Sequence, residues 1–254
     1  MTAHVIAVVN QKGGVSKSTT AQIIGDALTL KGERVLFVDL DAQGNLTYAL
    51  GSEPVRASSY AVLTGTADAD QSILETAQGA LIPASPMLST LDTKLSSTRG
   101  RAYILRDALR PILERYDYII IDTPPALGNT VINALTAADE AVIPVKADVF
   151  SLQGLAALSQ TLEAVMSSTN SGLRIAGILL QQYNSRTVLS RQITEMVDHA
   201  AVQLKTRVFT ATIRDATAIR EAQALQTNVV EYAKRQKVGQ DIRAFMRELI
   251  PAYK

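Results

Sequence analysis

Two lysines flank a glycine pair in the segment Lys12–Thr19, which reads KGGVSKST. Glycines let the backbone bend tightly, so that successive N–H groups face one concave turn and can bind phosphate oxygens. A helix that begins directly after such a turn adds the positive end of its dipole. In this arrangement Lys17 would contact the β- and γ-phosphates of a nucleotide, and the Ser18 hydroxyl would bind Mg²⁺.

The segment departs from the common phosphate-loop pattern G-x-x-x-x-G-K-[ST]. Gln11 and Ser16 occupy the two glycine positions, and Lys12 is an additional cation at the start of the loop. A plain Gly-Gly turn before an amphipathic helix, with incidentally exposed lysines, is the alternative interpretation.

Carboxylates at the ends of two further apolar runs favour the phosphate-loop interpretation. Asp39 and Asp41 end the run RVLFVDLD, and Asp122 ends the run YIIID. Ligands bind beyond the carboxyl ends of parallel strands, where these side chains would meet. An aspartate there can hold Mg²⁺ directly or through water, although a single one is often only a turn or cap residue. The three strand ends together predict a nucleotide and magnesium site.

Alternating strands and helices must position these residues. His4–Val9, a helix over Lys17–Lys31 and the strand Arg34–Leu40 form a βαβ unit, which requires parallel strands. Later predicted strands are Tyr118–Asp122, Ala141–Val145 and Gly172–Gln181, and later predicted helices are Thr130–Ala138, Leu152–Met166, Val188–Ala201 and Val238–Leu249. The irregular segment Val55–Gly100 gives no clear prediction. We expect an α/β fold with a doubly wound, mostly parallel sheet flanked by helices, as a single domain over residues 1–254.

Composition excludes several classes of protein. The 254 residues are 47 % hydrophobic and 19 % charged, which supports a folded core rather than a disordered chain. There is no cysteine and there are only two histidines, so disulfides, thiolate metal centres and multi-histidine metal sites are excluded. No apolar run reaches the roughly 18 residues of a membrane helix, and the first ten residues lack a signal-peptide pattern. We expect a cytoplasmic protein.

The net charge of +1 conceals a gradient along the chain. Residues 1–173 carry 12 Lys and Arg against 17 Asp and Glu, whereas residues 174–254 carry 13 against 7. A basic C-terminal third suggests a polyanionic partner, and scattered solvated charge is the alternative.

Three segments resemble the deviant Walker A, A′ and B motifs of ParA-type partition ATPases, which belong to the MinD/ParA group. They are Lys12–Thr19, Asp39–Asn45 (DLDAQGN) and Tyr116–Gly128 (YDYIIIDTPPALG). The likeness extends through Ile82–Ser85, Ile132–Leu135, Ile143–Val145 and Leu179–Thr187, and thus runs nearly end to end. Because the chain starts at its first strand, it resembles the short members without an N-terminal helix-turn-helix domain.

This resemblance implies an ATP hydrolase that uses Mg²⁺ and forms a face-to-face homodimer on binding ATP. Lys12 matches the lysine that reaches the partner's phosphates, and Asp41 matches the carboxylate that positions the attacking water. Ser18, Asp39 and Asp122 would serve the metal, and Thr123–Asn129 would be the switch segment that responds to the γ-phosphate. The remaining expected nucleotide contacts are Gly13, Gly14, Val15, Ser16, Lys17 and Thr19 at the phosphates and Gln182, Tyr183 and Ile213 at the adenine.

Ser16 stands where the family usually has glycine. If the backbone there needs a positive φ, a β-carbon costs about 1–2 kcal/mol. We therefore expect nucleotide binding to survive and hydrolysis to be slow.

The resemblance also implies DNA binding without sequence preference by the ATP-bound dimer, association with the nucleoid, and a ParB-like centromere-binding partner that stimulates hydrolysis. The transfer of DNA-binding residues is weaker. The two arginines of the family's Pro-Arg-Asn-x-Arg stretch are replaced by Asp215 and Ala218. The candidate DNA contacts in this chain are Arg186, Arg214, Arg220, Lys234, Arg235 and Lys237.

A membrane-cycling positioning ATPase of the MinD type is the main alternative. It depends on the terminal helix Val238–Ile250, whose apolar residues recur at helical spacing. The mixed charges of this helix favour docking on the core over a membrane surface. A nucleotide-dependent enzyme or carrier on the same fold, and an inactive scaffold, are further alternatives.

Overall fold

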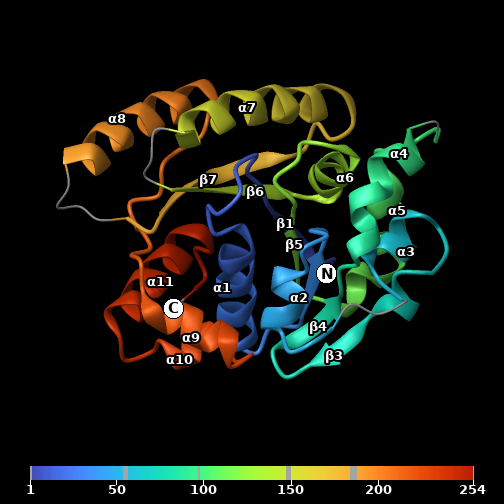
Figure 1. Ribbon diagram of the computed structural model, residues 1–254, viewed down its shortest axis with the longest axis horizontal. Helices are drawn as coiled ribbons and strands as arrows, with labels where there is room; N and C mark the ends of the chain where they lie inside the picture. The colour runs from blue at the N-terminus through green and yellow to red at the C-terminus, as the bar shows by residue number, and fades with distance from the viewer. Residues whose placement is uncertain (1, 54–56, 97, 147–149, 184–187, 254) are drawn as a thin grey trace.

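The computed structural model describes residues 2–53, 57–96, 98–146, 150–183 and 188–253. Within these residues seven strands form a sheet in the order β3-β4-β2-β5-β1-β6-β7 (Figure 1). Their bounds are β1 His4–Val8, β2 Val35–Asp39, β3 Leu74–Thr76, β4 Gly79–Ile82, β5 Tyr118–Asp122, β6 Glu140–Lys146 and β7 Arg174–Gln181. Neighbouring strands are parallel except in the hairpin β3–β4. The expected doubly wound, mostly parallel sheet is confirmed.

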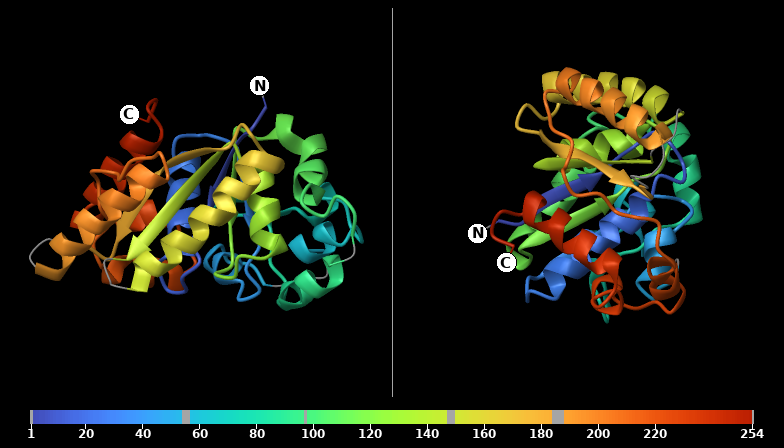
Figure 2. Two further views of the ribbon diagram at one scale, coloured as in Figure 1. Left: turned by 90° about the horizontal axis from the view of Figure 1, so that it is seen from above. Right: turned by 90° about the vertical axis from the view of Figure 1, so that its left-hand side faces the viewer.

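Helices cover both faces of the sheet, as the continuous apolar strands require (Figure 2). One face packs against α1 Lys17–Thr29, α2 Asn45–Ala49, α9 Thr217–Ala224, α10 Val229–Tyr232 and α11 Lys237–Leu249. The other packs against α4 Leu91–Leu95, α5 Ile104–Leu109, α6 Asn129–Ala137, α7 Phe150–Ser168 and α8 Val188–Gln203. The segment without a clear prediction also contains α3 Ser59–Leu63 and the β3–β4 hairpin. Short 3₁₀ turns span Asp70–Ser72, Pro86–Thr90 and Arg110–Arg115.

Strand register brings the predicted carboxylates to one edge of the sheet. Asp39 of β2 and Asp122 of β5 are direct partners across adjacent parallel strands. Val8, the last residue of β1, is the other partner of Asp122. The turn that follows β1 therefore begins beside both carboxylates, as expected from the rule for parallel sheets.

Close packing of α1 on the sheet sets the position of that turn. Gly25 of α1 lies directly against the ring of Phe37 in β2, and a β-carbon at Gly25 would overlap that ring. A side chain there would push the helix away from the sheet.

The terminal helix α11 docks on the core. Its apolar residues Ile242, Phe245, Met246 and Leu249 are buried in the cluster shared with α1. The predicted docking of this helix is therefore confirmed. In the described part of the chain, none of the helices has the length and apolar character needed to span a membrane.

Candidate nucleotide-binding site

The turn between β1 and α1 is anchored at its start by Asn10. This buried side chain donates to the carbonyl of Pro144 at 2.7 Å and accepts the N–H of Lys12 at 3.0 Å. Gly14 has a φ of +73°, a conformation that favours glycine. A β-carbon built on Gly13 or Gly14 would meet no atom within 4 Å, so this side of the turn is open to a ligand. Val15 is 1 % exposed, so its side chain packs in the protein interior and holds the turn in place.

Ser16 has a left-handed backbone, with φ 68° and ψ 35°. Its carbonyl accepts the N–H and the hydroxyl of Thr20, at 2.8 and 2.7 Å. The left-handed geometry that would favour glycine is thus present, and the β-carbon of Ser16 costs about 1–2 kcal/mol.

Lys17 lies at the base of the turn and is 6 % exposed. Its Nζ donates to the carbonyl of Lys12 at 2.9 Å. Burial lowers the pKa of Lys17, and the charges of Asp122 and Asp41 oppose this shift. A phosphate oxygen placed here would meet a desolvated ammonium, which strengthens the attraction between them.

The two strand-end aspartates differ in their hydrogen bonds. Asp39 Oδ1 accepts the N–H of Asp41 at 3.0 Å, and Oδ2 accepts the N–H and hydroxyl of Thr47 at 2.8 and 2.7 Å. Burial raises the pKa of Asp39 to about 6. Because its two oxygens already hold the segment after β2, the contacts of Asp39 suit it to positioning Asp41 better than to the expected metal role.

Asp122 is fully buried, and neither of its carboxylate oxygens has a hydrogen bond of normal geometry within the described residues. Burial and the charge of Asp39 raise the pKa of Asp122 well above its usual value, while the neighbouring Ser18 hydroxyl and Lys17 oppose the shift. A buried carboxylate without partners is costly unless a cation or water satisfies it. Asp122 and Ser18 therefore fit a Mg²⁺ site.

This site does not need a cluster of protein ligands. In the described chain, no group of three or more His, Cys, Asp or Glu residues could hold a metal ion. Mg²⁺ at nucleotide sites is usually held by one or two protein groups, waters and the phosphates themselves. The donor set of Ser18 and Asp122 agrees with that pattern.

A cavity of about 640 Å³ opens above the turn. Its lining residues are Gly13, Gly14, Ser16, Lys17, Ser18, Thr19, Asp41, Gln43, Asn45, Tyr48, Ala49, Pro125, Gln223 and Ala224. Asp41 is 8 % exposed, and its Oδ1 accepts the N–H of Gln43 at 3.0 Å. The phosphate-loop residues and Asp41 thus face one space.

One wall of the cavity was missed by the sequence analysis. Tyr48 and Ala49 come from α2, and Gln223 and Ala224 come from the end of α9. These residues carry no motif, and α9 follows α1 by about two hundred residues in the chain. Only the packing of α9 against α1 and α2 could have revealed them.

The expected adenine contacts have different surroundings. Gln182 reaches the loop, where its Nε2 donates to Ser16 Oγ at 3.4 Å. Ile213 is fully buried in the core. Its N–H donates to the carbonyl of Leu180, and its carbonyl accepts the N–H of Tyr183. Tyr183 packs against the core, and its hydroxyl accepts from Thr194 in α8. The cavity lining includes none of these three expected residues, and the contacts of Ile213 are those of a core residue.

The candidate DNA contacts divide into paired and unpaired cations. Arg214 donates to both carboxylate oxygens of Asp241 at 2.5 and 2.7 Å and thereby bridges to α11. Arg220 pairs with Asp215 at 2.5 Å, and Lys234 pairs with Glu231 at 3.3 Å.

Two candidate DNA contacts have no ion pair in the described part of the chain. Arg235, which lies between α10 and α11, and Lys237, the first residue of α11, are exposed and form no ion pair in that part of the chain. Arg186 lies outside the described residues.

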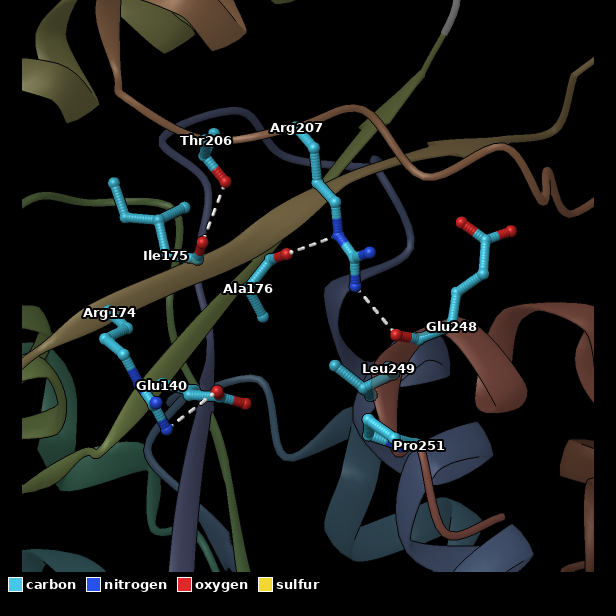
Figure 3. Close-up of a pocket in the computed structure, with 9 residues that line it drawn as sticks. All are labelled: Glu140, Arg174, Ile175, Ala176, Thr206, Arg207, Glu248, Leu249 and Pro251. Atoms are coloured by element: carbon cyan, nitrogen blue, oxygen red, sulfur yellow. Dashed lines mark hydrogen bonds and ion pairs between the residues drawn. The ribbon is translucent and has the colours of Figure 1, made fainter. Parts of the chain in front are cut away.

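A second cavity of about 450 Å³ lies at the amino ends of β6 and β7 (Figure 3). Its charged side chains already have partners within the protein: Arg174 pairs with Glu140 at 3.1 Å, and Arg207 donates to the backbone carbonyls of Ala176 and Glu248. Ligands of parallel sheets bind at the opposite edge. The cavity above the phosphate-binding turn is therefore the candidate site.

The doubly wound sheet, the phosphate-binding turn and the carboxylates at the neighbouring strand ends define a P-loop nucleoside triphosphatase. Comparison with known proteins agrees: the family described as AAA domain matches residues 3–175. Chromosome partitioning protein ParA of Caulobacter vibrioides is 38 % identical over 253 residues, covering 97 % of this chain and 94 % of that protein. The chain belongs to the ParA-type branch of this family.

Other relatives support this placement. Sporulation initiation inhibitor protein Soj of Bacillus subtilis is 43 % identical over 197 residues, covering 76 % of this chain and 78 % of Soj. A Mycobacterium smegmatis structure described as cobyrinic acid a,c-diamide synthase with bound ADP and magnesium is 34 % identical, with a TM-score of 0.78 over 93 % of this chain and 97 % of that one. The ATP complex of a Cyanothece McdA variant has a TM-score of 0.87 at 23 % identity, over 98 % of this chain and 96 % of that one, and shows the shared fold.

Proposed function

We propose that this chain is a DNA-partition ATPase that binds and hydrolyses ATP with Mg²⁺. The observation that carries the proposal is that Lys17, which lines the cavity, lies within the electrostatic influence of the buried Asp122 carboxylate. One is a desolvated ammonium, and the other is a buried carboxylate with no hydrogen bond of normal geometry in the described chain. A nucleoside triphosphate with its metal ion would supply an anion to the Lys17 ammonium, whose described hydrogen bond goes to a neutral carbonyl, and a cation to the Asp122 carboxylate. The ADP and magnesium named in the relative's structure support this choice of ligand.

The residues of the cavity have distinct roles in hydrolysis. Backbone N–H groups of the turn and the Lys17 ammonium bind the phosphates, while Ser18 and Asp122 hold the metal ion. Mg²⁺ held there would neutralise negative charge on the phosphate oxygens. Asp41, which Asp39 and Gln43 hold in place, orients the water that attacks the γ-phosphorus. The products are ADP and phosphate.

Lys12 completes the site of a second subunit in this proposal. A cation supplied across an interface links ATP binding to dimerisation, because the γ-phosphate charge is fully stabilised only when both subunits are present. Turnover is slow without a stimulating partner, since Ser16 strains the loop that must hold the phosphates.

The ATP-bound dimer binds DNA without sequence preference, associates with the nucleoid and is released when a ParB-like, DNA-bound partner stimulates hydrolysis. The partitioning role in the name of the Caulobacter relative and the basic C-terminal third support this part of the proposal. The MinD-like alternative is weaker, because the apolar face of α11 is buried against the core and leaves little to insert into a membrane.

Gel-shift measurements on arbitrary duplex DNA test the proposal. We expect binding with ATP and Mg²⁺, little binding with ADP or without nucleotide, and a steep loss of affinity as salt rises. Vesicles of anionic lipid serve as the parallel sample. ATP-dependent binding to the vesicles without binding to DNA would favour the MinD-like alternative and reject DNA partition.

A further inference from the structure

Three polar side chains line one side of α1 where it faces the C-terminal segment. Thr19, Gln22 and Asp26 are separated by three and four residues, which places them on the same face of the helix. Gln22 and Asp26 are fully buried. We call these three residues the polar stripe. It begins at the nucleotide cavity, because Thr19 is one of the lining residues.

The polar stripe binds the end of α9. Gln223 Nε2 donates to Thr19 Oγ1 and to Gln22 Oε1, at 3.2 Å in both cases. Gln22 Nε2 in turn lies 3.5 Å from the carbonyl of Thr227, which follows α9. Gln223 also lines the cavity, so the first of these contacts lies in the wall of the ligand site.

The polar stripe also binds the start of α10. Asp26 Oδ2 accepts the N–H of Val229 at 2.7 Å, and the Asp26 carbonyl accepts Asn228 Nδ2 at 3.2 Å. Burial raises the pKa of Asp26 to about 8, which reflects how completely its carboxyl is removed from water. The contact between α1 and α10 therefore includes buried hydrogen bonds beside its apolar packing.

A third glutamine extends the contacts to the other wall helix. Gln78, in the β3–β4 turn, is 3 % exposed and accepts from Gln22 Nε2 at 3.1 Å. Its own Nε2 donates to the carbonyls of Ala49 in α2 and Gln226 after α9, at 3.2 and 3.1 Å. One buried network thus joins α1 to both helices that form the missed wall.

Buried polar networks differ from apolar contacts in a way that matters here. Apolar side chains of similar volume tolerate small relative shifts better, whereas buried amides and carboxyls lose their hydrogen bonds when their partners move. A shift of α1 relative to α9 would leave several buried polar groups unpaired. The network therefore links the positions of α9 and α10 to that of α1.

We propose that the polar stripe couples occupancy of the nucleotide cavity to the position and order of α9 and α10. A bound nucleotide restrains Thr19 and Gln223, and Gln22 and Asp26 extend that restraint to Val229. Arg220 lies on α9, and Lys234–Lys237 follow α10. If the proposed DNA binding holds, the same coupling makes the basic segment depend on nucleotide.

Amide hydrogen exchange measured with and without ADP and Mg²⁺ tests the coupling and needs no DNA. In the wild-type chain we expect nucleotide to slow amide exchange in residues 12–19. We also expect it to slow exchange in residues 217–233 by at least about five-fold, which is the lower end of typical coupling between two sites. Gln22→Met keeps the volume of the side chain but removes its donor and acceptor. In this variant we expect nucleotide still to slow amide exchange in residues 12–19 but no longer to slow it in residues 217–233.

Two further variants support the comparison. Gln240→Met changes an exposed glutamine of α11 that makes no side-chain hydrogen bond in the described residues, and it should behave as wild type. Asp26→Leu replaces a desolvated carboxyl by an apolar side chain of similar size, so it keeps the proposal testable if Gln22→Met does not fold. It should lose the slowing only in residues 228–233.

The outcomes separate this inference from the proposed function. Slowing at 12–19 with no change at 217–233 in the wild type, or wild-type slowing in Gln22→Met and Asp26→Leu, overturns the coupling and leaves nucleotide binding intact. No slowing at 12–19 in the wild-type chain rejects the nucleotide site, and the coupling with it.

Discussion

Ser16 and Gln182 meet across the phosphate-binding turn, and both have left-handed backbones. Their φ values are 68° and 51°, and Gln182 Nε2 donates to Ser16 Oγ at 3.4 Å. The preceding Gln181 donates to Thr20 Oγ1 at 2.8 Å, and that hydroxyl donates to the Ser16 carbonyl. Two consecutive glutamines at the end of β7 therefore hold Ser16 by its side chain and its backbone. This support keeps a strained non-glycine residue in the conformation that a phosphate loop requires.

Replacing Ser16 with glycine should speed hydrolysis. Glycine removes about 1–2 kcal/mol of left-handed strain, and if that strain opposes the transition state the rate rises roughly five- to thirty-fold. The dissociation constant for nucleotide should change little. Steady-state release of phosphate measures the rate, and Ser16→Ala, which keeps the β-carbon, is the matched control. An unchanged rate in Ser16→Gly would show that the strain does not limit turnover.

Lys12→Ala should separate nucleotide binding from dimerisation. The variant keeps the turn and Lys17, so each monomer still binds ATP. It should nevertheless stay monomeric, because the charge supplied across the interface is missing. Analytical ultracentrifugation with a non-hydrolysable ATP analogue measures the change, and Lys94→Ala on α4 is the control. A dimer of Lys12→Ala formed at the wild-type concentration would contradict the proposed role.

Asp122→Asn should weaken the dependence of nucleotide affinity on magnesium. The wild-type carboxylate has no hydrogen bond of normal geometry in the described chain and is free to hold the ion or its water. Removing such a group typically costs about 10- to 100-fold in metal affinity. Titration calorimetry with ADP, with and without Mg²⁺, measures it. Affinity without Mg²⁺ is the internal control, and an equal fall in both conditions would point to a general loss of the site.

Asp26 should make the fold less stable as pH rises. Its pKa is about 8 in the folded chain and near 3.8 when unfolded, so between these values the folded state binds more protons. Its stabilising contribution is complete below about pH 4 and is lost as pH rises toward 8. Asp26→Asn keeps an acceptor for Val229 and removes the titration. The free energy of unfolding of the variant minus that of the wild type, measured with urea, should rise by at least about 2 kcal/mol from pH 5 to pH 8.5. If the free energy of unfolding changed with pH in the same way for the two proteins, the proposed titration of Asp26 would be refuted.

The unpaired cations should contribute more to DNA binding than the paired ones. The double variant Arg235→Ala/Lys237→Ala should bind DNA more weakly for every sequence and lower the salt dependence by about 0.9 for each phosphate that it no longer neutralises. Arg110→Ala, an exposed cation on the opposite face of the sheet, is the control. Arg214→Ala should instead lower the unfolding midpoint, because it breaks the bridge to Asp241. Equal salt slopes for the double variant and the wild type would place the DNA contacts elsewhere.

The sequence alone determined the parts of the site that are local in the chain. The turn before Lys17 and the apolar strands that end at Asp39 and Asp122 each depend on a few adjacent residues, and parallel pairing then brings the strand ends together. The backbone requirement at Ser16 was also foreseen, because a glycine position in a phosphate loop implies a left-handed φ.

Only the tertiary structure decided which side chains from distant segments contact those residues. Asp39 and Asp122 are alike in the sequence, yet only Asp39 receives hydrogen bonds from Thr47 and Asp41, which separates their roles. The wall containing Gln223 and the partner of Arg214 likewise depend on how the C-terminal helices pack. Burial and hydrogen bonding are properties of neighbours in space, and for these residues the neighbours lie far away along the chain.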